Sequence, residues 1–343
     1  MWQVIGQPRA VSLLQRSLEK GSLAHAYLFV GLPHVGKMTL AVNLAQALNC
    51  QVNEPPCLEC SSCQKIDHGK HADVQIISLT GTSEKNENKS KTEIGIEKIR
   101  QIQHSASLPP CEGIYKVFII SEADYLSIEA ANCLLKTLEE PFGRVLFILL
   151  AKDINSIPDT VISRCQKLEL MPLSADEVEN ELINRRGIEA QKARVLSRLC
   201  RGCIGWAISA SRDGELLEHY CEDRDKILDI IYNSYEERFG YAERLARQFN
   251  QKRETTMEVL NLWIDLWRDL LLAKTGLNEY IINTDIEEKL TQLAGGISII
   301  DIRSFIKKIQ EATQNLRRNV NPRLAIEVLM LYIPERRRER IGS

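Results

Sequence analysis

A short apolar run that ends in a glycine-rich loop constrains this chain more than any other segment. Residues 26–30 read Ala-Tyr-Leu-Phe-Val, and residues 31–37 read Gly-Leu-Pro-His-Val-Gly-Lys. Apolar residues at helical spacing follow over 38–48. A strand, a loop with two glycines and a lysine, and then a helix are the order that a phosphate-binding P-loop requires. The chain is therefore expected to fold around a P-loop α/β domain.

Further apolar runs extend this pattern through the first half of the chain. Strands are expected at 74–79, 116–120 and 145–150, separated by helix-like stretches. Such alternation is typical of a parallel sheet covered by helices. After Ser174, whose spacing from Glu177 matches a helix capping box, the β pattern does not return. We predict three domains: an α/β domain over 1–170, a small helical domain over 171–212 and an all-helical domain over 213–343.

Composition narrows the possible partners. The 343 residues carry a formal net charge of −2, which argues against a protein that binds DNA through overall basicity. No apolar run approaches the roughly 18 residues of a membrane span, and no secretory signal is seen at the start, so a cytoplasmic protein without membrane contact is expected. Residues 81–93 have no apolar side chain to bury and are expected to form a mobile loop, and the basic tail at 335–340 is expected to be a solvated end.

The P-loop departs from the pattern that hydrolysis needs. Gly31 and Gly36 would let the backbone turn its N–H groups toward phosphate, and Lys37 would reach the β- and γ-phosphates. The residue after this lysine is normally Ser or Thr, whose hydroxyl binds Mg²⁺. Met38 stands there instead, and a thioether is a poor ligand for a hard cation. Thr39 carries a hydroxyl but comes one position late, about 100° around the helix.

The expected acidic site is incomplete as well. The strand at 116–120 is followed by Ser121 and Glu122, a pattern similar to the end of a Walker B strand. Ser121 stands where an Asp normally binds magnesium. Without that metal ligand, Glu122 could not polarise water effectively for attack on ATP. Two losses in one site predict weak or absent ATP hydrolysis, and they leave open whether ATP or ADP binds at all.

Four of the ten cysteines predict a metal site, because they lie within fourteen residues. Cys50, Cys57, Cys60 and Cys63 have the spacing C-x6-C-x2-C-x2-C. Four thiolates suit tetrahedral Zn²⁺, and a set without histidine or carboxylate is typical of a structural site. An iron–sulfur cluster is the alternative. Among the other six cysteines, Cys165 follows Arg164, and five are expected to be small buried residues.

Several longer strings make the chain similar to a known family. They are residues 25–29 (His-Ala-Tyr-Leu-Phe), the cysteine insertion at 50–63, residues 94–100 (Ile-Gly-Ile-Glu-Lys-Ile-Arg), residues 130–141 (Ala-Ala-Asn-Cys-Leu-Leu-Lys-Thr-Leu-Glu-Glu-Pro) and residues 163–165 (Ser-Arg-Cys). The chain resembles the clamp-loader subunits of bacterial DNA polymerase III, which belong to the AAA+ family. The resemblance covers roughly residues 1–210 by motif and the remainder by helical character and length. It implies an AAA+ domain, a helical lid and a C-terminal collar.

The resemblance also implies a role for one arginine. In this family the arginine of the Ser-Arg-Cys motif works in trans, because it projects into the nucleotide site of the next subunit. Transferred to this chain, Arg164 is the arginine finger, positioned by Ser163 and by a strand end at Val161 and Ile162.

Further departures from a motor subunit imply a stator. Lys152 stands where sensor 1 usually has Thr or Ser, and Trp206 stands where a motor presents the sensor-2 arginine. Together with Met38 and Ser121, these residues imply a subunit that assists its neighbours and does not hydrolyse ATP itself. The implied partners are the gamma or tau motor subunits and the delta subunit in a hetero-pentamer. That complex opens the sliding clamp and holds primed DNA, so this chain would meet DNA through the complex.

Two other functions stay open on the sequence alone. One is an active motor subunit of the clamp-loader or another AAA+ class, with Thr39 in place of the missing hydroxyl. The other is a zinc-dependent nucleic-acid-binding module. The near-neutral charge and the lack of basic clustering around 50–63 count against the second.

Overall fold

The structure is a computed structural model that describes residues 2–52, 55–79, 93–140, 143–318 and 320–334. The loop predicted at 81–93 falls, except for Glu93, outside the described residues, and so does the tail at 335–340. The chain divides into two compact units. The first comprises Met1–Val178 and Gly202–Trp206, and the second comprises Glu179–Arg201 and Ala207–Ser343. The segment 171–212 is thus shared between the units, and the three-domain division stays a prediction.

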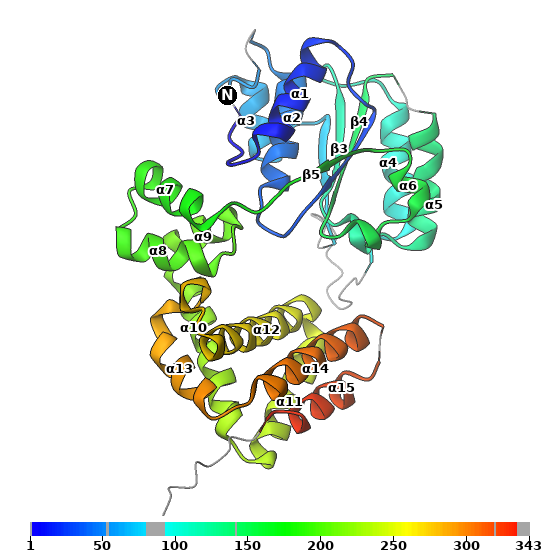
Figure 1. Cartoon of the computed structure of the whole chain (residues 1–343). Coiled ribbons are helices and arrows are strands. Elements are labelled where there is room, and N and C mark those ends of the chain that lie inside the picture. Colours follow the sequence, from blue (N-terminus) through cyan, green and yellow to red (C-terminus); the bar gives the residue numbers. More distant parts are fainter. Residues whose placement is uncertain (1, 53–54, 80–92, 141–142, 319, 335–343) are drawn as a thin grey trace, which may run out of the picture. The chain divides into compact units, whose positions relative to one another are not determined.

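One parallel sheet organises the first unit (Figure 1), as predicted. Its strands are β1 (Ala26–Val30), β2 (Val74–Ile77), β3 (Lys116–Ile120), β4 (Val145–Ala151) and β5 (Gln166–Glu169). Their order is β2-β3-β4-β1-β5, and every neighbouring pair is parallel. Every residue of β1, β3 and β4 is buried. Because both faces of such strands are covered, their sequences are nearly continuous apolar runs and do not alternate with polar residues.

Helices cover both faces of this sheet. One face carries α1 (Pro8–Glu19), α2 (Lys37–Asn49) and α3 (Ser61–Asp67), and the other carries α4 (Ile96–Ser107), α5 (Ile128–Glu139) and α6 (Asp159–Ile162). Successive strand residues point to opposite faces. Phe29 and Ile148 therefore lie in the core under α1–α3, whereas Leu28 and Phe147 lie in the core under α4–α6. Two short 3-10 helices, Ala123–Tyr125 and Ile154–Ser156, follow β3 and β4.

Two local expectations differ from the structure around Arg164. Val161 and Ile162 form the end of α6, so the strand end predicted there was wrong. Pro158 at the N-cap and Asp159 in the first turn start this short helix, and Val161 is buried in the core. The strand β5 was not predicted from the sequence. It lacks an apolar run, because only Leu168 of its four residues is buried.

All regular elements described in the second unit are helical, as predicted. The three-helix segment at its start contains α7 (Ala175–Arg186), α8 (Ala190–Leu199) and α9 (Ile204–Arg212); the division between the units falls within α7 and α9. The following helices are α10 (Gly214–Tyr232), α11 (Tyr235–Gln251), α12 (Arg253–Thr275), α13 (Glu287–Gly295), α14 (Ile299–Arg317) and α15 (Pro322–Leu331), with 3-10 turns at Asn278–Tyr280 and Thr284–Ile286. Among the described residues, no helix combines the length and the apolarity that crossing a membrane would require.

The core of the second unit is built around α12. Trp263 and Trp267 are fully buried, and their rings lie 5.9 and 4.4 Å from the ring of Phe305 on α14. The indole N–H of Trp263 donates to the hydroxyl of Tyr241 at 3.2 Å. Both tryptophans are core residues, as their helical spacing predicted.

A tight backbone contact fixes the segment that returns to the first unit. The N–H of Leu173 donates to the carbonyl of Gly202 at 3.0 Å. Gly202 has φ +77, and a Cβ on it would lie 2.2 Å from the carbonyl oxygen of Leu173. Only glycine fits this close approach, because the backbone itself would be displaced by any side chain.

We expect Gly202→Ala to lower the free energy of unfolding by about 3 kcal/mol, from the left-handed backbone together with the steric overlap. Gly187 is the matched control, because it has φ +66 and a methyl group on its Cα would meet no atom within 4 Å. Gly187→Ala should cost only about 1 kcal/mol. Urea denaturation followed by circular dichroism measures both variants, and equal losses would contradict the role of the Leu173 contact.

Candidate functional site

The carboxyl edge of the sheet brings the P-loop beside the ends of β3 and β4. Val30 pairs with Ala151, and the N–H of Gly31 donates to the carbonyl of Ala151 at 3.2 Å. The P-loop therefore starts next to Lys152. Because β4 lies between β1 and β3, Ser121 and Glu122 follow next along the same edge. The structure thus assembles the expected nucleotide-site positions at one edge.

Within the P-loop, the lysine is turned back onto the loop itself. The ammonium of Lys37 donates to the carbonyls of Gly31 at 2.5 Å and Leu32 at 2.8 Å. Burial lowers the pKa of Lys37 to about 8, although the negative charge of Asp124 opposes this shift. Thr39, the candidate replacement for the missing hydroxyl, is exposed on α2.

The two carboxylates after β3 hold backbone groups. Glu122 accepts the N–H of Leu79 at 2.7 Å. Asp124 accepts the N–H of Lys152 at 2.8 Å and that of Asp153 at 3.3 Å. Their oxygens therefore stabilise the chain beyond β2 and the turn after β4. The sequence indicated Glu122 as a site residue but not these structural partners of Glu122 and Asp124, which lie 28 to 43 residues away.

The four clustered cysteines converge, as their spacing predicted. The Sγ atoms of Cys50, Cys57, Cys60 and Cys63 all lie within 4.8 Å of one another. Those of Cys57 and Cys63 are 3.9 Å apart. Sulfur atoms on a tetrahedral ion with Zn–S bonds of about 2.3 Å would be about 3.8 Å apart, so the set is compatible with a structural zinc ion.

Backbone N–H groups point at these sulfur atoms. The N–H of Cys60 donates to Cys57 Sγ at 3.3 Å, and the N–H of Cys63 donates to Cys60 Sγ at 3.5 Å, where α3 begins. Burial opposes ionisation of Cys60, but N–H donors of Gln51 and Cys63 outweigh it and lower the pKa to about 6. This arrangement favours the thiolate of Cys60, the form that binds metal, whereas burial raises the pKa of the Cys63 thiol.

Of the five scattered cysteines expected to be buried, four are not fully buried. Cys111 is exposed, whereas Cys200 is buried and the others are intermediate. The buried environment predicted for Cys111 was wrong, because this residue lies in the link between α4 and β3, at the surface of the unit.

Arg164 lies at the edge of the sheet opposite the P-loop. It precedes β5 by two residues, and Gln166 of β5 pairs with Tyr27 near the start of β1. The P-loop begins only at Gly31, after the other end of β1. The offset is about six residues, or roughly 20 Å at the rise of a parallel strand. The side chain of Arg164 is too short to serve the P-loop of its own chain.

The guanidinium of Arg164 is held at two nitrogens. Nη1 donates to the carbonyl of Thr160 at 2.8 Å and to the hydroxyl of Ser163 at 3.3 Å. Nη2 forms an ion pair with the carboxylate of Glu139 at the end of α5. Ser163 and Arg164 therefore lie together, as expected, and Glu139 joins them. The only sequence signal for Glu139 is its place in the 130–141 string.

A P-loop at the carboxyl edge of a parallel sheet, with a cysteine module inserted between α2 and β2, defines a P-loop α/β protein of the AAA+ type. Residues 6–174 match the family described as "DNA polymerase III, delta subunit", and residues 218–335 match the one described as its C-terminal part. The DNA polymerase III subunit delta' of Bacillus subtilis is 31% identical over 96% of each chain. The chain belongs to the family of DNA polymerase III delta' subunits.

The chain is also similar, at lower identity, to two further proteins. The tau subunit of Bacillus subtilis is 29% identical, and the match covers 96% of this chain but 60% of tau. A solved structure of a DNA polymerase III gamma subunit-related protein from Thermotoga maritima has a TM-score of 0.48 and 17% identity, covering 96% of this chain and 100% of that one.

We expect the purified chain to release phosphate from Mg-ATP at the background rate. Met38 has no oxygen ligand for magnesium, the hydroxyl of Ser121 donates to the carbonyl of Ile77 at 3.0 Å, and Glu122 accepts a backbone N–H. A phosphate-release assay at saturating ATP measures this rate. Lys37→Ala should give the same background. Turnover in the wild-type chain that disappears in Lys37→Ala would reveal a working site and contradict the prediction.

Proposed function

We propose that this chain is the delta' subunit of the DNA polymerase III clamp loader and acts there as a stator. In this role it supports ATP-dependent loading of the sliding clamp onto primed DNA by supplying Arg164 to the nucleotide site of a neighbouring motor subunit. The position of Arg164 carries the proposal. It lies across the sheet from the P-loop of its own chain, so a nucleotide that it contacts must belong to another subunit.

The chemistry of the guanidinium suits this role. An arginine finger neutralises charge that develops on the γ-phosphate, and its planar fork of N–H donors matches phosphate oxygens. Ser163 is proposed to help position it. The degenerate loop at Gly31, Gly36 and Lys37 is proposed to have a structural role, and binding of ATP or ADP there is not needed for the function.

The proposed partners follow from the same family. They are the gamma or tau motor subunits and the delta subunit in a cytoplasmic hetero-pentamer, with DNA and the sliding clamp met through the complex. The segment 171–212 would act as the lid, and the helices of 213–343 would contribute to the collar that joins the subunits.

An active motor subunit is the second candidate, and the similarity to tau is the observation in its favour. It needs a magnesium ligand after Lys37, where Met38 stands, and an acid where Ser121 stands. The stator role requires neither, so we favour it.

For the cysteine module we propose one structural zinc ion held by Cys50, Cys57, Cys60 and Cys63. The four-sulfur donor set and the separation of 3.9 Å between two of its sulfur atoms support zinc. When bound, the ion would link the start of α3 to the end of α2 and would leave no open position for catalysis.

Removal of the finger should affect the assembled complex and leave the isolated subunit intact. We expect Arg164→Ala to lower hydrolysis at the neighbouring site by roughly 10³-fold and the steady-state ATPase rate of the reconstituted complex several-fold. Arg144→Ala is the matched control, because Arg144 is another arginine of the same unit and is exposed. The ATPase assay includes the sliding clamp and primed DNA. An unchanged rate for Arg164→Ala would reject the stator role.

Elemental analysis of the purified chain should find one zinc ion per chain. Cys57→Ser should lose it, because Cys57 is one of the four converging thiols, whereas Cys111→Ser should retain it. Cys57 is only partly buried, so this variant tests metal binding with less damage to the core than Cys63→Ser. Iron with visible absorbance, or zinc retained in Cys57→Ser, would overturn the assignment.

A further inference from the structure

We propose that Glu139 is the positioning residue for Arg164, holding its guanidinium in the orientation in which it meets the nucleotide of the neighbouring subunit. This inference rests on the proposed function. An arginine side chain has several rotatable bonds, and its freedom must be restricted before it can act on a partner's phosphate. A group that fixes its orientation in advance therefore speeds the reaction of the assembled complex.

The guanidinium is fixed from two separate elements. Thr160 and Ser163 come from α6 and its end, and both contact Nη1. Glu139 comes from the last residue of α5 and contacts Nη2. With Nη1 and Nη2 both held, rotation about the terminal bonds of the Arg164 side chain is restricted. Without Glu139, the remaining contacts would come only from the arginine's own local segment.

The last turns of α5, which carry the carboxylate of Glu139, are held in place by neighbouring residues. The side-chain amide of Gln103 on α4 donates to the carbonyl of Cys133 at 2.7 Å and to the hydroxyl of Thr137 at 2.9 Å. Leu138, next to Glu139, is buried in the core under α4–α6. The backbone that presents Glu139 is thus held by both polar and apolar contacts.

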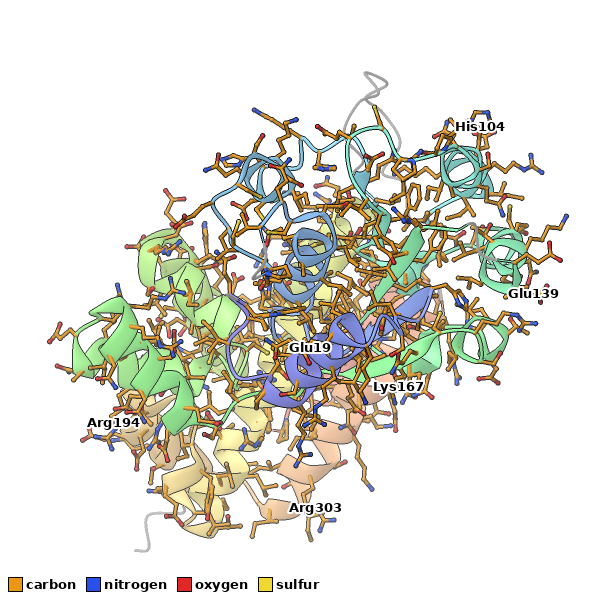
Figure 2. All side chains as sticks on the ribbon, turned by 90° about the horizontal axis from the view of Figure 1, so that it is seen from above. Glu19, His104, Glu139, Lys167, Arg194 and Arg303 are labelled. Carbon is orange, nitrogen blue, oxygen red and sulfur yellow. The ribbon has the colours of Figure 1, made fainter. Side chains whose placement is uncertain are left out.

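The same arrangement leaves the arginine open to a partner. A guanidinium has five N–H donors, and the Nε–H of Arg164 has no acceptor among the described residues. The side chains of Arg164 and Glu139 are 33% and 49% exposed, and Figure 2 shows Glu139 at the outer edge of the α/β unit. Glu139 can therefore orient Arg164 while the remaining donors face an incoming phosphate.

The test uses the reconstituted complex with motor subunits, delta subunit, sliding clamp and primed DNA. We expect Glu139→Gln, which keeps the shape but removes the charge, to lower kcat for ATP about ten-fold with KM and assembly unchanged. Glu139→Asp should recover part of the rate. Glu140→Gln is the matched control, because it removes the same charge from the adjacent exposed position and should behave as wild type.

A double variant separates positioning from a general loss of structure. In a background of Arg164→Ala, Glu139→Gln should have no further effect, because the guanidinium that Glu139 holds is gone. Equal rates for Glu139→Gln and Glu140→Gln, a rise in kcat, or a further loss in the double variant would overturn the inference. If Arg164→Ala leaves the rate unchanged, the proposed function itself fails. If only Glu139→Gln has no effect, the stator role stands and the positioning role fails.

Discussion

The parallel pairing of β1 between β4 and β5 is the constraint on which the functional layout of this chain depends. Parallel strands have all their carboxyl ends at one edge and all their amino ends at the other. The P-loop and the turns after β3 and β4 leave the first edge, whereas Arg164 enters at the second. One rigid sheet thus separates a nucleotide loop from an arginine that cannot reach it. Such a separation suits a subunit whose arginine acts on a neighbour.

At the carboxyl edge of the sheet, the loop has the shape of a nucleotide site, but its charged side chains bond to backbone groups of the chain. Lys37 is bonded to the loop carbonyls, and Glu122 and Asp124 hold backbone N–H groups. The N–H of Gly205 donates to the carbonyl of His34 at 2.9 Å. A Cβ on Gly205 would lie 2.8 Å from that oxygen, so the start of α9 closes against the loop at backbone distance. These contacts hold the loop and the turns after β3 and β4 in place through groups of the chain itself.

Local patterns in the sequence predicted the structure correctly. The buried strands at 26–30 and 116–120 are apolar runs, and the capping box at Ser174 and Glu177 forms as predicted, with the N–H of Glu177 at 3.2 Å from the hydroxyl of Ser174. The cysteine cluster could be predicted for the same reason, because its four cysteines lie within one short insertion. The outermost strand β5 was not predicted, because a strand with one buried residue has no periodic apolar pattern. The contact between Glu139 and Arg164 could not be predicted from the sequence, because the two residues are 25 positions apart and meet only after α5 and α6 pack.

The cysteine module is joined to the sheet by polar contacts on two sides. On one side, the amide of Gln46 on α2 donates to the carbonyl of Cys63 at 3.0 Å. On the other, Lys65 of α3 pairs with Glu112 at 2.5 Å in the link that leads into β3. Asp73 accepts three N–H groups of that link at 2.7–2.8 Å, which outweigh its burial and lower its pKa.

Through these contacts, a metal ion at the cysteines would stabilise α3 and the link before β3. A helix of seven residues such as α3 is too short to persist by itself. It is held by the cluster at its start, by α2 behind it and by the link before β3. Loss of the cluster would therefore loosen the link that enters β3, the strand that Ser121 and Glu122 follow. The cysteines lie outside the sheet, yet through Lys65 and Glu112 their module contacts the link that enters β3, and Asp73 holds the same link.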